Sequence, residues 1–251
     1  MSAPGAVRAV VRQRWRDLLF IHWPAPAERL RPLVPAELAL DCLDGSAWIT
    51  LIPFLIADSH PARLPAALSI AFLETNLRTY VRGPDGEPGI YFFSLEAASR
   101  FAVAAARLCY GLPYFHAVMS RRVDGPRVAY TSTRRGARDA ALEVTWTVGA
   151  PREPARPGSR DHFLIERYCL YVRRRSGLHR ARVRHSPYPL RGAIVERLEE
   201  SLLAAAGLPT PSEPMLCHHS PGVDVEIGAL ESAARARRPP RLYCSAATHA
   251  L

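Results

Sequence analysis

Four side chains with useful chemistry stand at alternate positions of one short stretch of the sequence, residues 73–81. They are Glu74, Asn76, Arg78 and Tyr80. Because successive side chains of a β-strand point to opposite faces, all four share one face of any strand that forms here. A carboxylate, an amide, a guanidinium and a phenol on one face could bind a small polar molecule. The same face could instead be exposed to solvent, and the spacing alone leaves both interpretations open.

Two residues in and beyond this stretch are candidates for proton transfer. Glu74 could act as a general base, and Tyr114 could donate a proton or a hydrogen bond to a substrate carbonyl. The alternative for Tyr114 is an ordinary aromatic side chain in the wall of a cavity. The candidate catalytic residues are therefore Glu74 and Tyr114.

Arginine side chains are the candidates for holding a substrate. Arg78 or Arg107 could bind a carboxylate through two parallel hydrogen bonds. Each could equally form a salt bridge with Glu74 or Glu96. The aromatic stretch 89–96 could line a cavity or belong to an ordinary core. The candidate substrate-binding residues are Asn76, Arg78, Tyr91 and Arg107.

The sequence contains no lysine, so all 33 basic residues are arginine. Schiff-base catalysis, an internal aldimine with pyridoxal phosphate and a phosphate-binding P-loop all need a lysine amine. These mechanisms are excluded. No cofactor-binding motif takes their place, and we expect no cofactor.

The nine histidines form no HxH or HExxH pattern. Cys217, His218 and His219 are adjacent, but their spacing matches no known zinc-binding arrangement. His22, His185 and His218 are far apart in the sequence and could still meet in the fold. We expect no metal site.

The formal net charge is +10, and arginines gather in two neighbouring places. One is the triplet 173–175, and the other is the alternating row Arg180, Arg182 and Arg184. A basic strand face could bind phosphates, or it could protect an exposed strand from pairing with another chain. No nucleic-acid-binding module surrounds these residues, so nucleic acid is the weakest of the possible partners.

Frequent prolines and glycines divide the sequence into short runs rich in β-branched and aromatic residues. This pattern is typical of a mainly β protein (α+β) with a mostly antiparallel sheet, bent or closed into a cone or barrel. The predicted strands are 15–23, 47–56, 68–81, 89–96, 115–123, 127–133, 141–148, 168–174, 178–185 and 223–227.

Four short helices are expected beside the sheet. The longest, 191–206, has Ile194, Val195, Leu198, Leu202 and Leu203 along one stripe. The other three are 27–31, 99–109 and 161–167, the last with Asp161 as its N-cap. We predict one domain over residues 8–230 and a basic, poorly ordered tail over 231–251.

Length and composition bound the class of protein. The chain has 251 residues, of which 48% are hydrophobic, a balance typical of globular proteins. The longest mostly apolar run, 49–57, is too short to span a bilayer, and residues 1–20 lack the apolar core of a signal peptide. The five cysteines are scattered, which favours reduced thiols. We therefore expect a cytoplasmic location, no membrane contact and a possible homo-oligomer.

Several segments resemble, in order, the uncharacterised bacterial family typified by YqjF. The most informative are ETNLRTYV at 74–81, PGIYFFSL at 88–95 and ARLCYGLPY at 106–114. Further matching segments are FIHW at 20–23, AW at 47–48, PF at 53–54, ERY at 166–168, HSPYPL at 185–190 and SPGVDV at 220–225. The resemblance covers most of residues 15–227.

That family is similar in turn to the acetoacetate decarboxylases, and the similarity implies a cone- or barrel-like sheet around an interior cavity. In the decarboxylases, Gly-x-Pro is followed by a lysine pair that includes the Schiff-base residue. Here Gly111-Leu112-Pro113 is followed by Tyr114 and Phe115, and neither can form an imine. The resemblance thus implies the scaffold and a cavity carboxylate at Glu74, and not the usual decarboxylation.

Three functions remain open from the sequence. The leading hypothesis is a protein that binds a small carboxylate- or carbonyl-bearing molecule in a polar cavity, with acid/base catalysis that needs no lysine. The second is a ligand-binding or sensing module without catalysis. The third is a basic protein that associates with nucleic acid.

Overall fold

One continuous sheet dominates the computed structural model, which describes residues 8–137, 139–211 and 215–233. Thirteen strands form this sheet in the described residues. Every predicted strand overlaps an observed one. The strands are β1 (Ala9–Ala25), β2 (Ala39–Leu40), β3 (Ala47–Pro61), β4 (Phe72–Arg82), β5 (Pro88–Ala97), β6 (Tyr114–Asp124), β7 (Arg127–Arg134), β8 (Ala141–Arg152), β9 (Cys169–Arg174), β10 (Gly177–Arg184), β11 (Leu190–Glu200), β12 (Leu216–Gly228) and β13 (Glu231–Ser232).

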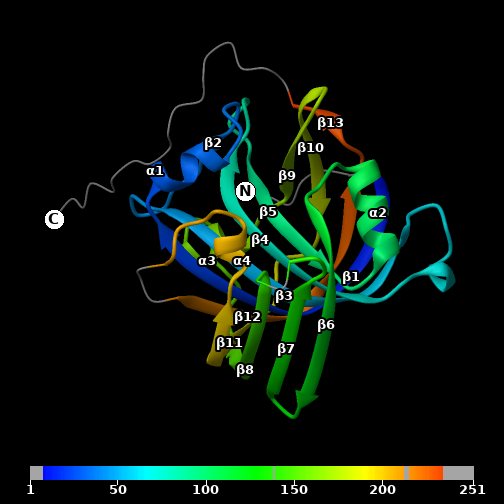
Figure 1. The fold of residues 1–251 in the computed structure, drawn as a ribbon, viewed down its shortest axis with the longest axis vertical. Helices are drawn as coiled ribbons and strands as arrows, with labels where there is room; N and C mark the ends of the chain where they lie inside the picture. Colours follow the sequence, from blue (N-terminus) through cyan, green and yellow to red (C-terminus); the bar gives the residue numbers. More distant parts are fainter. Residues whose placement is uncertain (1–7, 138, 212–214, 234–251) are drawn as a thin grey trace.

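The sheet closes on itself twice. Its order is β13-β10-β9-β5-β6-β7-β8-β11-β12-β1-β3-β4-β2, with additional pairings of β4 with β5 and of β10 with β12. The first additional pairing closes a large ring of β4, β5, β6, β7, β8, β11, β12, β1 and β3. Both together close a small ring of β4, β5, β9, β10, β12, β1 and β3. In Figure 1, β6, β7, β8 and β11 extend toward the lower end of the view, and β9 and β10 rise toward the upper end.

The sheet is mostly antiparallel, as predicted, with parallel pairing where β5 meets β6 and β9. Parallel neighbours need a crossover connection. The segment between β5 and β6 supplies one through α2 (Arg100–Cys109), whose N-terminus is capped by Ser99, the residue at which this helix was predicted to begin.

The strands shared by both rings have one face in each of two apolar cores. In β4, Phe72 and Tyr80 belong to the core of the small ring, whereas Leu77 and Val81 belong to the core of the large ring. All seven strands of the small ring contribute side chains to the first core, which we call the small-ring core. The alternation along β4 therefore assigns each residue to one ring interior.

The prediction of a long amphipathic helix at 191–206 is wrong. Leu190–Glu200 is strand β11, paired with β8, and only Leu202–Ala205 is helical (α4). A β-bulge explains the misleading pattern, because the register shifts between Val195 and Arg197. The extra residue, Glu196, returns Leu198 to the side that packs on the large-ring core, where Val195 also lies. A spacing of three, typical of a helix, thus arises in a bulged strand.

The other helices are close to their predicted positions. They are α1 (Ala27–Leu30), which continues into the 3-10 helix η1 (Arg31–Leu33), and α3 (Arg160–Ile165). The N-cap of α3 is Ser159, which accepts a hydrogen bond from the His162 amide, so the assignment of this role to Asp161 is wrong. A second 3-10 helix, η2 (Ala66–Leu68), precedes β4.

Three features bear on the remaining expectations. Glu231–Ser232 forms β13 and pairs with β10, so the sheet extends past the predicted boundary at 231, and residues 234–251 of the predicted tail lie outside the described residues. Cys109, Cys169 and Cys217 are free thiols, in line with the expectation of reduced cysteines. No helix in the described part of the chain combines the length and the apolar character needed to cross a membrane.

Candidate functional site

The polar row of β4 is buried in the small-ring core. Glu74, Asn76 and Arg78 are 4%, 6% and 5% exposed, and Tyr80 is fully buried. They alternate with Leu73, Leu77 and Val81 on the large-ring side, because β4 pairs with β3 without a register shift from Phe72 to Thr79. The structure therefore excludes the interpretation of this row as a solvent-facing surface.

Glu74 and Tyr114 contact each other directly. The Tyr114 hydroxyl donates a hydrogen bond to Oε2 of Glu74 at 2.9 Å. Tyr114 begins β6, next to Leu95 of β5, and its carbonyl accepts a hydrogen bond from Nε of Arg107 at 2.7 Å. The structure thus brings together the two residues that sequence analysis selected for proton transfer.

Burial changes the acidity of both groups. It raises the pKa of Glu74 to about 8; the hydrogen bond from Tyr114 lowers this pKa and the charge of Glu96 raises it further. Burial, together with the Glu74 carboxylate, raises the pKa of Tyr114 well above its usual value. A carboxyl group with a pKa near neutrality can both accept and donate a proton at working pH.

Arg78 is a buried cation that has no buried counter-charge in contact with it among the described residues. Its Cζ lies 6.0 Å from the ring centre of Phe20 and 5.8 Å from that of Tyr80. Nη2 donates to the carbonyl of Leu164 at a long 3.4 Å, and Nε has no partner in the described residues. No salt bridge of Arg78 is found in that same part of the chain. Oδ1 of Asn76, on the same strand face, is likewise unpartnered.

A second cluster of polar side chains lies in the core beside Arg78. Nδ1 of His22 lies 2.9 Å from Oγ1 of Thr50, which lies 2.5 Å from the hydroxyl of Tyr80. The His22 ring is 5.4 Å from that of His218, whose Nε2 lies 3.1 Å from Oδ1 of Asp161. The contact between His22 and His218 was left open by the sequence, and Thr50 was not among the predicted residues. Its signal is a polar residue on the same strand face as Trp48 and Ile52.

His185 lies elsewhere in this core, between Tyr168 and Tyr188 at ring distances of 4.7 and 4.6 Å. The nearby carboxylate of Glu166 accepts hydrogen bonds from the Tyr168 hydroxyl and the Tyr188 amide. Over residues 8–137, 139–211 and 215–233, no three His, Cys, Asp or Glu side chains are grouped so that they could hold a metal ion.

Two of the predicted binding residues lie outside the small-ring core. Tyr91 is half-buried and packs against the large-ring core, because its strand neighbours Ile90 and Phe92 occupy the small-ring side. Arg107 is exposed on α2, and its Cζ lies 5.6 Å from the ring centre of Phe115. The structure therefore brings together Glu74, Asn76, Arg78 and Tyr114, without Tyr91 and Arg107.

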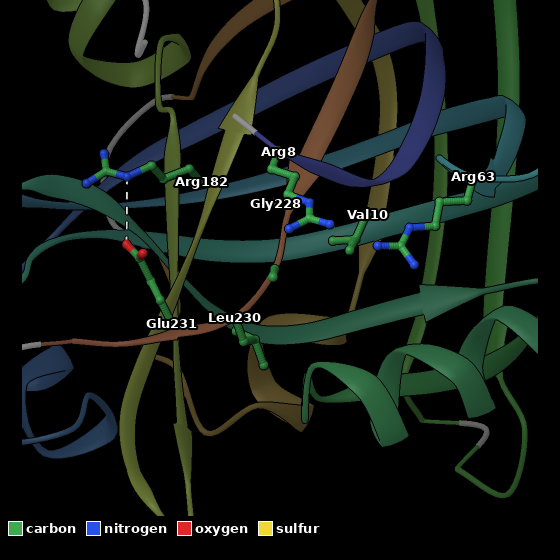
Figure 2. A pocket seen from close by; sticks show the side chains of 8 residues that line it. Arg8, Val10, Arg63, Arg182, Gly228, Leu230 and Glu231 are labelled. Atoms are coloured by element: carbon green, nitrogen blue, oxygen red, sulfur yellow. Dashed lines mark ion pairs between the residues drawn. The ribbon is translucent and has the colours of Figure 1, made fainter. Parts of the chain in front are cut away.

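A separate cleft of about 520 Å³ lies where β1, β10 and the end of β12 meet. In Figure 2 the guanidinium groups of Arg8 and Arg63 flank Val10, and Arg182 turns toward Glu231, with which it forms an ion pair. None of the predicted site residues lines this cleft. It is lined by Arg8, Val10, Arg63, Arg182, Gly228, Ala229, Leu230 and Glu231.

Comparison with known sequences gives one family. Residues 12–224 match the DUF2071 family, described as an uncharacterized conserved protein. The uncharacterized protein YqjF of Bacillus subtilis is 39% identical over 217 residues, which are 86% of this chain and 89% of YqjF. The resemblance read from the sequence motifs is confirmed.

Solved structures of low sequence identity share the fold. Acetoacetate decarboxylase from Legionella pneumophila is 13% identical with a TM-score of 0.61, over 93% of this chain and 92% of that one. An acetoacetate decarboxylase-like enzyme from Sphingomonas wittichii is 16% identical with a TM-score of 0.60, over 89% and 92%. The enduracididine biosynthesis enzyme MppR, complexed with pyruvate, is 13% identical with a TM-score of 0.61, over 92% and 91%. The predicted fold class is confirmed.

Proposed function

The chain belongs to the DUF2071 family, and from this premise we propose that its small ring binds a small carboxylate- or carbonyl-bearing organic molecule. The observation that carries the proposal is Arg78, a guanidinium that is 5% exposed and forms no ion pair within the described residues. A buried charge without a partner is strongly unfavourable, and a carboxylate is the natural partner of a guanidinium fork. The fold supports the proposal, because a structural neighbour, MppR, is described in complex with pyruvate.

Catalysis would use the Glu74–Tyr114 pair. Asn76 stands between Glu74 and Arg78 on one strand face, and the Cα atoms of the two outer residues are about 13 Å apart in an extended strand. A molecule held at Arg78 by its carboxylate can extend past Asn76 toward Glu74. There Glu74 would take up a proton and Tyr114 would hydrogen-bond a carbonyl oxygen. No imine forms in this scheme, because the chain has no lysine.

The nucleic-acid hypothesis has weak structural support. The arginine row of β10 is occupied by ion pairs: Arg180 with Asp85, Glu87 and Glu231, Arg182 with Glu87, and Arg184 with Glu226. Arginines engaged with acidic neighbours are poor phosphate contacts, since a phosphate must displace a carboxylate first. A binding module without catalysis has the same site requirements as the enzyme and differs from it only in product formation.

Calorimetric titration with pyruvate and with acetoacetate tests the binding proposal. We expect saturable binding by the native protein and at least a tenfold weaker affinity for Arg78→Gln, as expected when a charged hydrogen-bond partner is removed. Arg197→Gln is the matched control, because Arg197 pairs with Glu143 and Glu199 on the exposed side of β11. Equal affinity of Arg78→Gln and native protein would exclude the assigned site.

Product analysis separates the enzyme from the binding module. If the pair is catalytic, Glu74→Gln abolishes turnover of any small acid that the native protein converts, while the variant still folds and binds it. Turnover that survives this substitution removes Glu74 from the mechanism. Binding without any product after long incubation favours the sensing module.

A further inference from the structure

A chain of hydrogen bonds in the small-ring core fixes the tautomer of His22. The chain ends at the carbonyl oxygen of Leu164, which can only accept and which receives the hydroxyl of Tyr80 at 2.5 Å. Tyr80 has one hydroxyl hydrogen, so its oxygen must accept from Thr50 at 2.5 Å. Thr50 has thereby used its own hydrogen, and its oxygen accepts from Nδ1 of His22 at 2.9 Å. In the longer contact of 3.4 Å with the Tyr80 hydroxyl, Nδ1 of His22 is again the donor.

His22 therefore carries its hydrogen on Nδ1 and presents a lone pair on Nε2. Burial lowers the pKa of His22 well below its usual value, and the neighbouring His218 and Arg78 lower it further, so the ring is neutral. His22 is fully buried, and its Nε2 atom has no hydrogen-bond partner in the described residues. A buried acceptor without a donor is costly, so this atom is positioned to receive a hydrogen bond from something outside the protein chain.

The same reasoning applies to His218. Its Nε2 lies 3.1 Å from a carboxylate oxygen of Asp161, and an ionised carboxylate only accepts. Burial lowers the pKa of His218, so its ring is neutral, with the hydrogen on Nε2 and the lone pair on Nδ1. Nδ1 is also buried and unpartnered in the described part of the chain. The two imidazole rings are neighbours at 5.4 Å, so two bare acceptors occupy one region of the core.

The guanidinium of Arg78, which forms no ion pair in the described residues, is close enough to His22 for its charge to lower the pKa of the histidine. Phe20 is shared between them, because the His22 ring stacks on it at 6.1 Å and Cζ of Arg78 lies 6.0 Å from its centre. Nε of Arg78 is a donor without a partner in residues 8–137, 139–211 and 215–233. This region therefore offers a positive donor to an anion and, next to it, neutral acceptors to a donor group.

We infer that the natural ligand is a small hydroxy carboxylic acid, whose carboxylate accepts from Arg78 and whose hydroxyl donates to Nε2 of His22. The inference rests on the proposed function and specifies the ligand class. A hydroxyl fits better than an ammonium group, because an ammonium would bring a second cation next to Arg78. The carboxylate of Glu166, another acidic group beside this core, is already held by Tyr168 and Tyr188.

Matched pairs of acids test the inference. Lactate with propionate, and 3-hydroxybutyrate with butyrate, differ only by the hydroxyl group. For at least one pair, we expect the native protein to bind the hydroxy acid about tenfold more tightly, the contribution of one buried hydrogen bond. His22→Asn retains a donor in the position of Nδ1 and removes Nε2. It should bind the hydroxy acid as weakly as the plain acid, with the affinity for the plain acid unchanged. His179→Asn, a substitution in the β9–β10 hairpin, should keep the preference.

A second measurement is independent of affinity. Nitrogen chemical shifts of His22 in the native, ligand-free protein should show the hydrogen on Nδ1 and a bare Nε2. A hydrogen on Nε2 would overturn the inference, because that atom could then only donate.

The outcomes of the titrations are distinguishable. If both acids of each pair bind equally and both depend on Arg78, the hydroxyl inference fails and the proposed function stands. If alanine binds more tightly than lactate, the donor is an ammonium group and the hydroxyl inference is wrong. If His22→Asn weakens both acids to the same extent, His22 has only a structural role. If no acid binds, the proposed function fails and the inference fails with it.

Discussion

The hydroxyl of Tyr114 lies 2.9 Å from the carboxylate of Glu74, although the two residues are 40 positions apart in the sequence. Two strand pairings produce this contact. β4 places Glu74 opposite Ala97 of β5, and the parallel pairing of β5 with β6 places Tyr114 beside Leu95. The crossover through α2 therefore determines which side chain reaches Glu74.

The raised pKa of Glu74 predicts a pH dependence of stability. Folding raises this pKa from 4.5 to about 8, so the folded state keeps a proton that the unfolded chain releases. The free energy of unfolding contributed by Glu74 therefore falls as the pH rises from about 4.5 to about 8, and it is constant above that range.

Glu74→Gln removes this dependence. Relative to the native protein, we expect the variant to gain stability between about pH 5 and about pH 9, by up to a few kcal/mol. Denaturant unfolding of both proteins at the two pH values measures the gain. The histidines have lowered pKa values, which change the stability with pH in the opposite direction. Their contribution cancels when the unfolding free energy of one protein is subtracted from that of the other. A difference that does not change with pH would show that Glu74 is ionised normally.

Tyr114→Phe should raise the pKa of Glu74 above its native value, because the hydrogen bond from Tyr114 stabilises the carboxylate. The loss of this bond should also cost about 1 kcal/mol of stability when Glu74 is ionised. Carbon NMR titration of the Glu74 carboxyl group follows the pKa. Tyr171→Phe, which removes a hydrogen bond to the Glu87 carbonyl, is the control that should leave the Glu74 titration unchanged. An unaltered titration in Tyr114→Phe would contradict the role of the hydrogen bond.

Arg134 neutralises the fully buried carboxylate of Glu96. The two side chains form an ion pair at 2.5 Å, and Cζ of Arg134 lies 3.7 Å from the ring centre of Phe115. Arg134→Gln leaves Glu96 buried and unpaired, so we expect a loss of about 3–5 kcal/mol in unfolding free energy. Arg197→Gln breaks exposed ion pairs and should leave the stability almost unchanged. Chemical denaturation measures both variants, and similar losses would contradict the importance of burial.

Gly89 allows β5 and β9, which are neighbours in the small ring, to approach each other closely. A Cβ atom at this position would lie 2.6 Å from the carbonyl oxygen of Cys169 and 2.7 Å from the ring of Tyr171. Gly89→Ala should therefore separate the strands and cost about 1–3 kcal/mol or more. Gly192→Ala is the control, because no atom lies closer than 3.8 Å to its added Cβ. Thermal unfolding compares the two variants. An unchanged stability of Gly89→Ala would show that β5 and β9 can accommodate the added methyl group.

The sequence predicted the site best where the strand is regular. Glu74, Asn76 and Arg78 share a buried face because β4 runs without a bulge against β3, so simple alternation holds. The same reasoning fails in β11, where the bulge at Glu196 imitates the spacing of a helix. A one-residue insertion changes the face of every later side chain, and no local pattern reveals it.

Pairing between strands that are distant in the sequence accounts for the remaining differences between the predicted and the observed site. Tyr91 lies on β5, an aromatic strand with both faces buried. Which face points toward Glu74 depends on how the sheet closes into two rings, and the sequence of the strand does not specify this. Arg107 belongs to a helix whose outer side is exposed, so its guanidinium supports the backbone of Tyr114 without entering the core. The meeting of His22, Thr50 and Tyr80 depends on the pairing of β1, β3 and β4, which periodicity within each strand does not specify.

The pairing of β1 with β12 has a consequence for biosynthesis. β1 leaves the ribosome long before one of its two neighbours, β12, which spans Leu216–Gly228. Until β12 has been synthesised, neither ring can close, and one edge of β1 remains free to pair with non-native strands. The nascent chain should therefore expose this strand edge until β12 is synthesised and should fold slowly, since contacts this distant in sequence carry a large loop-closure cost.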